Sequence, residues 1–238
     1  MIFNFFKKNS QNNIKPIDIV IGASRYKLFK NRLITQKYNS SIYKKINNEL
    51  TEFIRLCPWE SEALFNLVKF AKLGCVEIGR FNGGSAFLFC LSNPKLKIYS
   101  IDIAPQNDSK LSTLLKKFNC GQNVELIIDD ANNYVKIFRK KNYKFDFLFI
   151  DGDHSFEGCL NDIKNWYPLL EPGGLIVFHD TSPDTGPTGG VLKAILEYCK
   201  KETINFIVPP NLTKRTWENP YGSLCIGIKP KSLKGKVI

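Results

Sequence analysis

The chain has 238 residues, of which 43% are hydrophobic, and this fits one α/β domain whose core needs no disulfides. A formal net charge of +12 suits a nucleic acid, an anionic lipid surface or an acidic substrate. The basic residues are spread along the chain, however, so we favour a general enrichment in lysine and do not expect nucleic acid as the partner. No segment is long and apolar enough to span a membrane, and seven cysteines without a C-x-x-C pair favour a reducing compartment, so we expect a cytoplasmic protein.

The chain is predicted to divide into an N-terminal extension, residues 1–58, and a main domain, residues 59–238, which form one compact unit. Apolar residues recur at helical spacing from Ile42 to Ile54. A second helix is predicted over Glu60–Leu73, with Gly74 as its stop. We expect these helices to cap the functional site or a second copy of the chain in a homodimer. Ordinary packing against the core is the alternative.

The segment Cys75–Asp102 has the pattern of strand, glycine turn, helix, strand and acid. Glycine lets the backbone approach a ligand closely, and the helix after the turn presents unpaired N–H groups to it. From Gly79 to Ser85 the spacing is G-x-x-x-G-G-S, which departs from the G-x-G-x-x-G of dinucleotide sites. Asp102 is suited to hold ribose hydroxyls. The segment therefore predicts a nucleoside-cofactor site, and a glycine turn without a ligand is the alternative.

Strands and helices alternate through the rest of the chain. The predicted strands are Cys75–Gly79, Lys97–Ile103, Val124–Ile128, Phe145–Ile150, Leu175–Phe178, Ile204–Val208 and Ser223–Ile228. Helices are predicted after the glycine turn, from Asp108, from Ser155 to Leu170 before a break at Glu171–Gly174, and over Val191–Cys199. This alternation predicts an α/β fold with a doubly wound, mostly parallel seven-stranded sheet.

The chain has two histidines, and each follows an apolar, strand-like run. His154 lies beside Asp151 and Asp153, and His179 lies beside Asp180. Ligands of open α/β sheets bind at the carboxyl ends of the strands, so we expect these side chains at the same edge as the glycine turn. Two ordinary polar residues at strand ends are the alternative, but we favour a functional role for at least one histidine.

Three motifs carry a resemblance to a known family. The turn E-I-G-R-F-N-G-G-S resembles motif I of class I S-adenosylmethionine-dependent methyltransferases. The runs I-D-G-D-H-S-F-E-G and W-Y-P-L-L-E-P-G-G-L-I-V-F-H-D-T resemble bacterial small-molecule O-methyltransferases, relatives of the catechol and caffeoyl types that act on sugars, antibiotics and phenols. The resemblance spans about Glu62 to Asp180. It implies methylation of a hydroxyl of a small molecule, such as a sugar or secondary metabolite, with S-adenosylmethionine, and an antiparallel C-terminal edge hairpin.

The resemblance also implies roles for individual residues. The implied cofactor-binding residues are Glu77, Gly79, Gly83 and Ser85 around the methionine part, Asp102 at the ribose, Asp130 and Ala131 at the adenine, and Asp153. His154 is the candidate general base, because a neutral imidazole accepts a proton as the acceptor oxygen attacks the methyl group. His179 is the second candidate, and Asp151 completes the implied catalytic set.

Metal-dependent relatives hold Mg²⁺ with acids that end the fourth and fifth strands, and Asp151 and Asp180 occupy those positions. Relatives of the catechol and caffeoyl type place Asn after the second acid, where this chain has Thr181. His179 would complete the set, although imidazole is a poorer Mg²⁺ ligand than oxygen. A metal-assisted and a metal-free reaction both stay open.

Other interpretations remain beside this one. A nucleic-acid methyltransferase would fit the basic charge, but D-G-D-H follows the fourth strand in place of the D/N-P-P-Y/F motif. A non-catalytic cofactor-binding protein and, last, a dinucleotide oxidoreductase are the others. The loop Thr181–Gly190 is predicted to be a substrate-facing flap. Lys214, Arg215 and Trp217 are candidates for selecting the acceptor, with ordinary surface residues as the alternative.

Overall fold

The computed structural model describes residues 50–56, 58–182, 189–208, 210 and 223–231. Most of the helix expected over Ile42–Ile54 lies outside the described residues. The same holds for positions 183–188 of the expected flap and for Lys214, Arg215 and Trp217. Among the described helices, none is long and apolar enough to cross a membrane.

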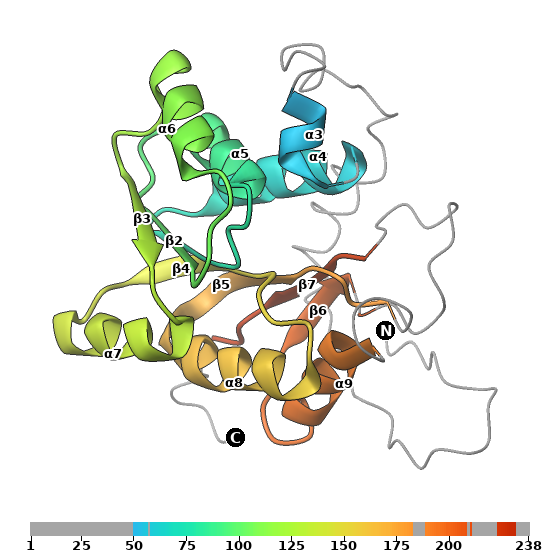
Figure 1. The fold of residues 1–238 in the computed structure, drawn as a ribbon. Helices are drawn as coiled ribbons and strands as arrows, with labels where there is room; N and C mark the ends of the chain where they lie inside the picture. Colours follow the sequence, from blue (N-terminus) through green and yellow to red (C-terminus); the bar gives the residue numbers. More distant parts are fainter. Residues whose placement is uncertain (1–49, 57, 183–188, 209, 211–222, 232–238) are drawn as a thin grey trace.

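A seven-stranded sheet forms the centre of the described part of the chain (Figure 1). Its strands are β1 (Cys75–Ile78), β2 (Ile98–Asp102), β3 (Val124–Ile128), β4 (Phe145–Ile150), β5 (Leu170–Phe178), β6 (Asn205–Val208) and β7 (Cys225–Ile228). The spatial order is β3-β2-β1-β4-β5-β7-β6. The first five strands pair in parallel, and β7 runs antiparallel to both β5 and β6. The predicted mostly parallel sheet with an antiparallel edge hairpin is confirmed.

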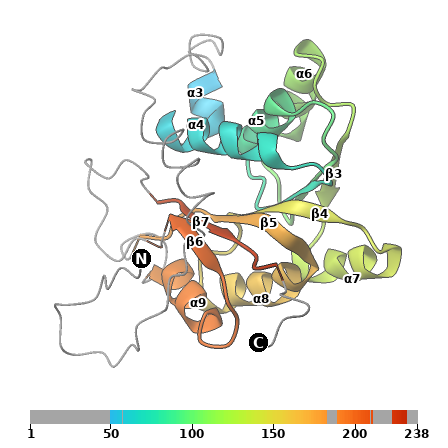
Figure 2. The same ribbon diagram turned by 180° about the vertical axis from the view of Figure 1, so that it is seen from behind.

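Helices cover both faces of this sheet (Figures 1 and 2). On one face lie α3 (Thr51–Ile54), α4 (Pro58–Leu67), α5 (Gly84–Ser92) and α6 (Asp108–Lys117). On the other face lie α7 (Ala131–Lys141), α8 (Phe156–Trp166) and α9 (Gly190–Tyr198). Short 3₁₀ turns over Val68–Phe70 and Tyr167–Leu169 follow α4 and α8.

Each face of the sheet has its own apolar core, because successive side chains of a strand point to opposite faces. In β4, Phe147 and Phe149 belong to the core beneath α4–α6, whereas Leu148 and Ile150 belong to the core beneath α7–α9. A strand covered on both faces needs an almost continuous apolar run, which is what F-D-F-L-F-I provides. The two cores fix the carboxyl ends of the central strands, where the candidate site lies.

Four predicted boundaries were wrong. The helix expected to reach Leu170 ends at Trp166, and β5 begins at Leu170, so Glu171–Gly174 lies within a strand and not in a loop. Gly173 has φ of 85° and the pairing with β4 shifts register there, an irregularity that accommodates proline and glycine within a strand. The helix expected over Glu60–Leu73 instead begins at Pro58 and gives way to a 3₁₀ turn after Leu67.

The structure adds a helix that the sequence analysis did not predict. This helix, α7, follows β3 directly, and the Asp130 carboxylate caps it by accepting a hydrogen bond from the backbone amide of Asn132 at 2.8 Å. Tyr134, Val135 and Phe138 form its buried face. The signal in the sequence is an acid before an amphipathic run, which is the usual start of a helix. The cap holds Asp130 and Asn132 at the end of β3.

Candidate active site

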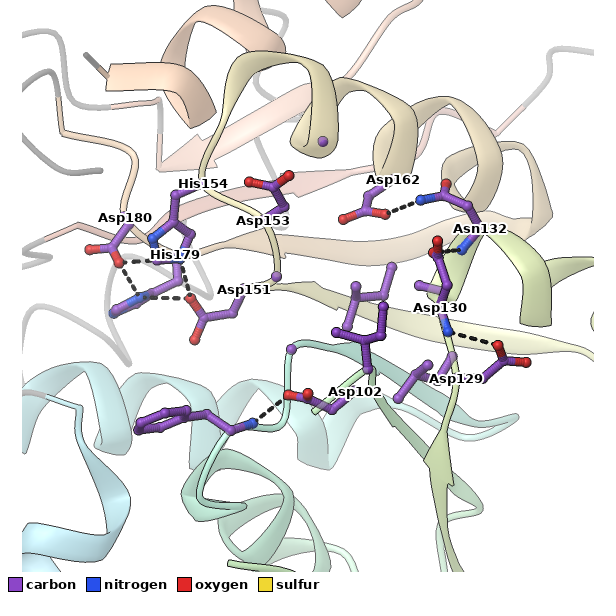
Figure 3. A pocket seen from close by; sticks show the side chains of 18 of the residues that line it. Asp102, Asp129, Asp130, Asn132, Asp151, Asp153, His154, Asp162, His179 and Asp180 are labelled. Carbon is purple, nitrogen blue, oxygen red and sulfur yellow. Dashed lines mark hydrogen bonds and ion pairs between the residues drawn. The ribbon is translucent and has the colours of Figure 1, made fainter. Parts of the chain in front are cut away.

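A cavity of about 680 Å³ opens at the carboxyl ends of the parallel strands. This volume lies within the range of small-molecule and cofactor sites. Figure 3 shows His154, His179 and Asp180 toward one end, the group of Asp130, Asn132 and Asp162 toward the other, and Asp102 between them. The predicted site residues that line the cavity are Gly79, Asp102, Asp130, Ala131, Asp151, Asp153, His154, His179 and Asp180.

The glycine turn after β1 brings backbone segments into close approach. Gly79 has φ of 90°, and a Cβ atom there would lie 2.0 Å from the carbonyl oxygen of Asp151. Gly83 has φ of 88°, and its Cβ would lie 2.6 Å from the side chain of Leu111. Gly79 is therefore required by a backbone contact within the protein, and Gly83 is favoured by its positive φ. Gly79 also lines the cavity, whereas Gly83 is not among the lining residues.

Glu77 and Ser85 are buried and are not among the residues that line the cavity. The Ser100 hydroxyl donates a hydrogen bond to Glu77, which links β1 to β2. Burial raises the pKa of Glu77 to about 7, although hydrogen bonds from Ser100 and Ser85 and the charge of Arg80 oppose the shift. Their predicted contact with the methionine part of a cofactor stays a prediction.

The carboxylate of Asp102 is held in place by two backbone amides. The Phe81 amide donates to Oδ2 at 2.7 Å, and the Ala104 amide donates to Oδ1 at 2.7 Å. Each carboxylate oxygen can accept more than one hydrogen bond. Asp102 therefore presents an oriented, partly exposed acceptor to the cavity, which suits a pair of neighbouring hydroxyl groups.

Arg80 is a buried residue of the glycine turn that the sequence analysis missed. Its side chain is 1% exposed and donates from Nε and Nη2 to the two carboxylate oxygens of Asp108, both at 2.8 Å. Nη1 donates to the carbonyl oxygens of Ser100 and, at 3.2 Å, Ile127. Arg80 thus joins the turn to β2, β3 and the start of α6. The available signal was an arginine in a turn that is expected to be buried. Because a buried arginine almost always has an acidic partner, its presence indicates an ion pair.

His179 is enclosed by three carboxylates. Its Nδ1 atom lies 3.1 Å from Asp151 Oδ1 and 3.3 Å from Asp180 Oδ2. Its Nε2 atom lies 3.3 Å from Oε2 of Glu60, an acid in the first turn of α4. The other oxygen of Glu60 accepts from the amide and hydroxyl of Ser223, at 3.1 and 3.0 Å. Glu60 was also missed, because nothing near it in the sequence points to a residue 119 positions away.

These contacts suit a protonated His179, which donates from both ring nitrogens. Burial alone would lower the pKa of His179, but Asp151, Asp180 and Glu60 together raise it well above its ordinary value. Burial would likewise raise the pKa of Asp151, and the charge of His179 together with hydrogen bonds from both histidines outweighs burial and lowers it. These neighbours favour the protonated form of His179, which disfavours it as the proton acceptor.

His154 is more accessible, with 34% of its side chain exposed against 11% for His179. Its Nε2 atom lies 3.5 Å from Asp151 Oδ1 and 3.6 Å from Asp180 Oδ2. A hydrogen bond to Asp151 raises the pKa of His154, and burial opposes the shift. The two predicted histidines are thus brought together around the same acids, but only His154 combines cavity lining with substantial exposure.

The residues of this cluster also fit a divalent cation. One ligand atom from each of Asp151, His154 and Asp180 lies within 4.8 Å of the others. Two carboxylates and one imidazole suit Mn²⁺, Fe²⁺ or Zn²⁺ at least as well as Mg²⁺, which prefers oxygen. The Thr181 hydroxyl donates to the Ser223 carbonyl at 2.7 Å and points toward β7. His154 would therefore be the third protein ligand of this group, whereas the Thr181 hydroxyl is engaged with Ser223.

Comparison with known proteins shows what the region around this site is similar to. Residues 76–181 match the family model described as a methyltransferase domain. The chain is 39% identical over 129 residues to an uncharacterized protein of Acanthamoeba polyphaga mimivirus, covering 50% of this chain and 56% of that protein. It is 30% identical over 106 residues to probable caffeoyl-CoA O-methyltransferase 3 of Dictyostelium discoideum, covering 43% and 41%. The chain thus spans about half the length of these curated relatives.

Solved structures agree on the fold. The O-methyltransferase TomG of Streptomyces achromogenes, in complex with SAM, superposes with a TM-score of 0.62 at 15% identity, covering 89% of this chain and all of that one. The O-methyltransferase of Bacillus cereus, in complex with SAH, gives 0.53 at 16% identity, covering 87% and 97%.

The chain thus has the class I methyltransferase fold, and residues 76–181 match the family model of a methyltransferase domain. The predicted family resemblance is confirmed. The bacterial origin stays a prediction, since one curated relative is viral and the other is from Dictyostelium. The cytoplasmic location and the homodimer also stay predictions.

Proposed function

We propose that the protein transfers a methyl group from S-adenosylmethionine to a hydroxyl oxygen of a small molecule. The observation that carries this proposal is one cavity with an oriented acid, Asp102, in its middle and a histidine–carboxylate cluster at one end. S-adenosylmethionine, when bound, supplies an electrophilic methyl group on sulfur. Asp102 would hold the ribose hydroxyls, and the glycine turn at Gly79, which lines the cavity, would lie beside the amino acid end.

His154 is the proposed proton acceptor, because it lines the cavity and is the more exposed histidine. As the acceptor oxygen forms its bond to the methyl carbon, the carbon–sulfur bond breaks and its electron pair stays on sulfur. The hydroxyl proton would pass to His154, at the ring nitrogen that does not face Asp151. Asp151 would orient the imidazole, and the same Oδ1 atom of Asp151 also contacts His179. Much of the rate would come from alignment of oxygen, carbon and sulfur.

A metal-assisted version of the same reaction is the second candidate, favoured by the clustering of Asp151, His154 and Asp180 within 4.8 Å. The cation would orient the acceptor oxygen and lower its pKa. In that version His154 is a ligand and not the base. Activity that survives chelation supports His154 as the base, and activity lost with EDTA and restored by Mn²⁺ or Mg²⁺ supports the metal.

Calorimetric titration with S-adenosylmethionine and S-adenosylhomocysteine tests the proposal first. Asp102→Asn is expected to weaken binding about 10- to 100-fold, because a charged acceptor for two hydroxyls is lost. Glu157→Gln, an exposed acid of α8 outside the cavity lining, is the matched control and should bind as the wild type does. Absence of binding to folded wild-type protein would refute the proposal. Binding followed by methylation of a panel of sugars and phenols would identify the acceptor class.

A further inference from the structure

Asp162 is a buried acid of the cavity to which neither the sequence motifs nor the proposed reaction gives a role. It lies within α8, is 4% exposed and lines the cavity at the end away from the histidines (Figure 3). Burial raises its pKa to about 7, although a hydrogen bond from Asn132 opposes the shift. Burial of a carboxylate is unfavourable unless hydrogen-bond donors compensate for the lost water, so we expect Asp162 to have a donor in the cavity.

One oxygen of Asp162 is already used by a chain of side-chain amides. Asn165 Nδ2 donates to Asn132 Oδ1 at 2.7 Å, and Asn132 Nδ2 donates to Asp162 Oδ1 at 3.3 Å. The first bond fixes the orientation of the Asn132 amide, so its NH₂ group must face Asp162. The chain therefore holds Asp162 in one rotamer and engages only Oδ1.

The other oxygen, Oδ2, lies beside the cavity wall formed by Gly152. A Cβ atom on Gly152 would lie 3.3 Å from Asp162 Oδ2 and 3.1 Å from Ile78 Cγ2, and both Gly152 and Ile78 line the cavity. The absence of a side chain at Gly152 thus leaves space next to Oδ2. A ligand that fills this end of the cavity meets an acceptor oxygen whose direction is already set.

We propose that Asp162 Oδ2 accepts a hydrogen bond from the exocyclic amino group of the adenine ring, a role that the sequence analysis gave to Asp130. The inference rests on the proposed function. If Asp102 holds the ribose and the methyl group lies at the His154 end, the base must lie at the opposite end, where Asp162 is (Figure 3). Asp130 is less buried than Asp162 and uses Oδ1 to cap α7, so Asp162 is the acid that is more deeply set in this end of the cavity. Ile103, an apolar lining residue that is 72% exposed, offers a surface for the flat ring.

The test compares two ligands that differ at one group of the base. S-adenosylhomocysteine carries an amino donor at this position, and S-inosylhomocysteine carries a carbonyl acceptor. A site built to accept from the amino group should favour the adenine ligand by about 10- to 100-fold in calorimetry. In Asp162→Asn the carbonyl oxygen stays with Asn132 and the NH₂ group turns to the cavity. This variant should lose the preference or reverse it, whereas Glu157→Gln should keep it.

Gly152→Ala is a second variant that leaves the carboxyl group in place. Its methyl group would crowd Asp162 Oδ2, so the same preference should fall several-fold. Thermal unfolding shows whether each variant is folded, and if Asp162→Asn does not fold, Gly152→Ala decides. A preference unchanged from the wild type in the folded variants would overturn the inference and leave the proposed function intact. Failure of the wild type to bind either ligand would overturn the proposed function instead.

Discussion

Replacement of Arg80 by methionine tests whether the buried arginine holds the glycine turn. Methionine keeps much of the apolar stem but removes the bidentate pair with Asp108 and leaves the carbonyl oxygens of Ser100 and Ile127 without this donor. Breaking a buried ion pair costs about 3–5 kcal/mol. Asp108 is 28% exposed, so water recovers part of the loss, and we expect about 3 kcal/mol.

Chemical denaturation measures this free energy, since the slope with denaturant should not change while the midpoint falls. Lys97→Met is the control, because its pair with Glu125 is exposed at 41% and 43% and should contribute less than about 1 kcal/mol. A loss in Arg80→Met no larger than in Lys97→Met would refute the reasoning. Cofactor affinity should also fall in Arg80→Met, because the next amide, that of Phe81, orients Asp102.

Three further outcomes are expected. Gly79→Ala should prevent stable folding, as judged by circular dichroism, because a Cβ atom cannot fit 2.0 Å from the Asp151 carbonyl oxygen. Gly74→Ala is the control and should fold, because its Cβ atom would lie 3.2 Å from the nearest atom. The Glu77 pKa is raised from 4.5 to about 7 on folding, so the free energy of unfolding of the wild type falls as the pH rises between these values. Glu77→Gln should lack this fall and should be more stable than the wild type by about 3 kcal/mol above pH 7 in denaturation curves. Parallel pH profiles of the two proteins would contradict this. If a metal binds, the affinity for Mn²⁺, measured by electron paramagnetic resonance, should be lost in Asp180→Asn. It should be kept in Thr181→Val, because the Thr181 hydroxyl is hydrogen-bonded to Ser223. Equal loss in both variants would refute the assignment of Asp180, and not Thr181, as a metal ligand.

The strands, and the edge of the sheet at which the site lies, can be predicted from local patterns in the sequence. β4 is an apolar run that ends at Asp151, and β2 ends at Asp102, so parallel pairing alone brings these acids to one edge. The scarcity of histidine then marks His154 and His179.

The missed residues depend on contacts between distant parts of the chain. Glu60 meets His179 and Ser223 across 119 and 163 positions, and Asp162 gains its meaning only from Asn132 and Gly152, which other elements supply. Helical periodicity predicts that a residue such as Asp162 faces inward but not that the inward side is a cavity. Glu171–Gly174 shows the opposite limit, since a register shift between strands overrides its local signal for a break.

The place of β7 between β5 and β6 has a consequence for the order of folding. Because β7 pairs with both neighbours, β6 has no described partner in the sheet until the later strand is inserted. Ser223, just before β7, donates hydrogen bonds from its amide and hydroxyl to Glu60, so these two contacts of the carboxylate that faces His179 form only when this late segment docks. Such long-range closures are slow steps of folding. The contact between Glu60 and His179 would therefore be completed late in folding.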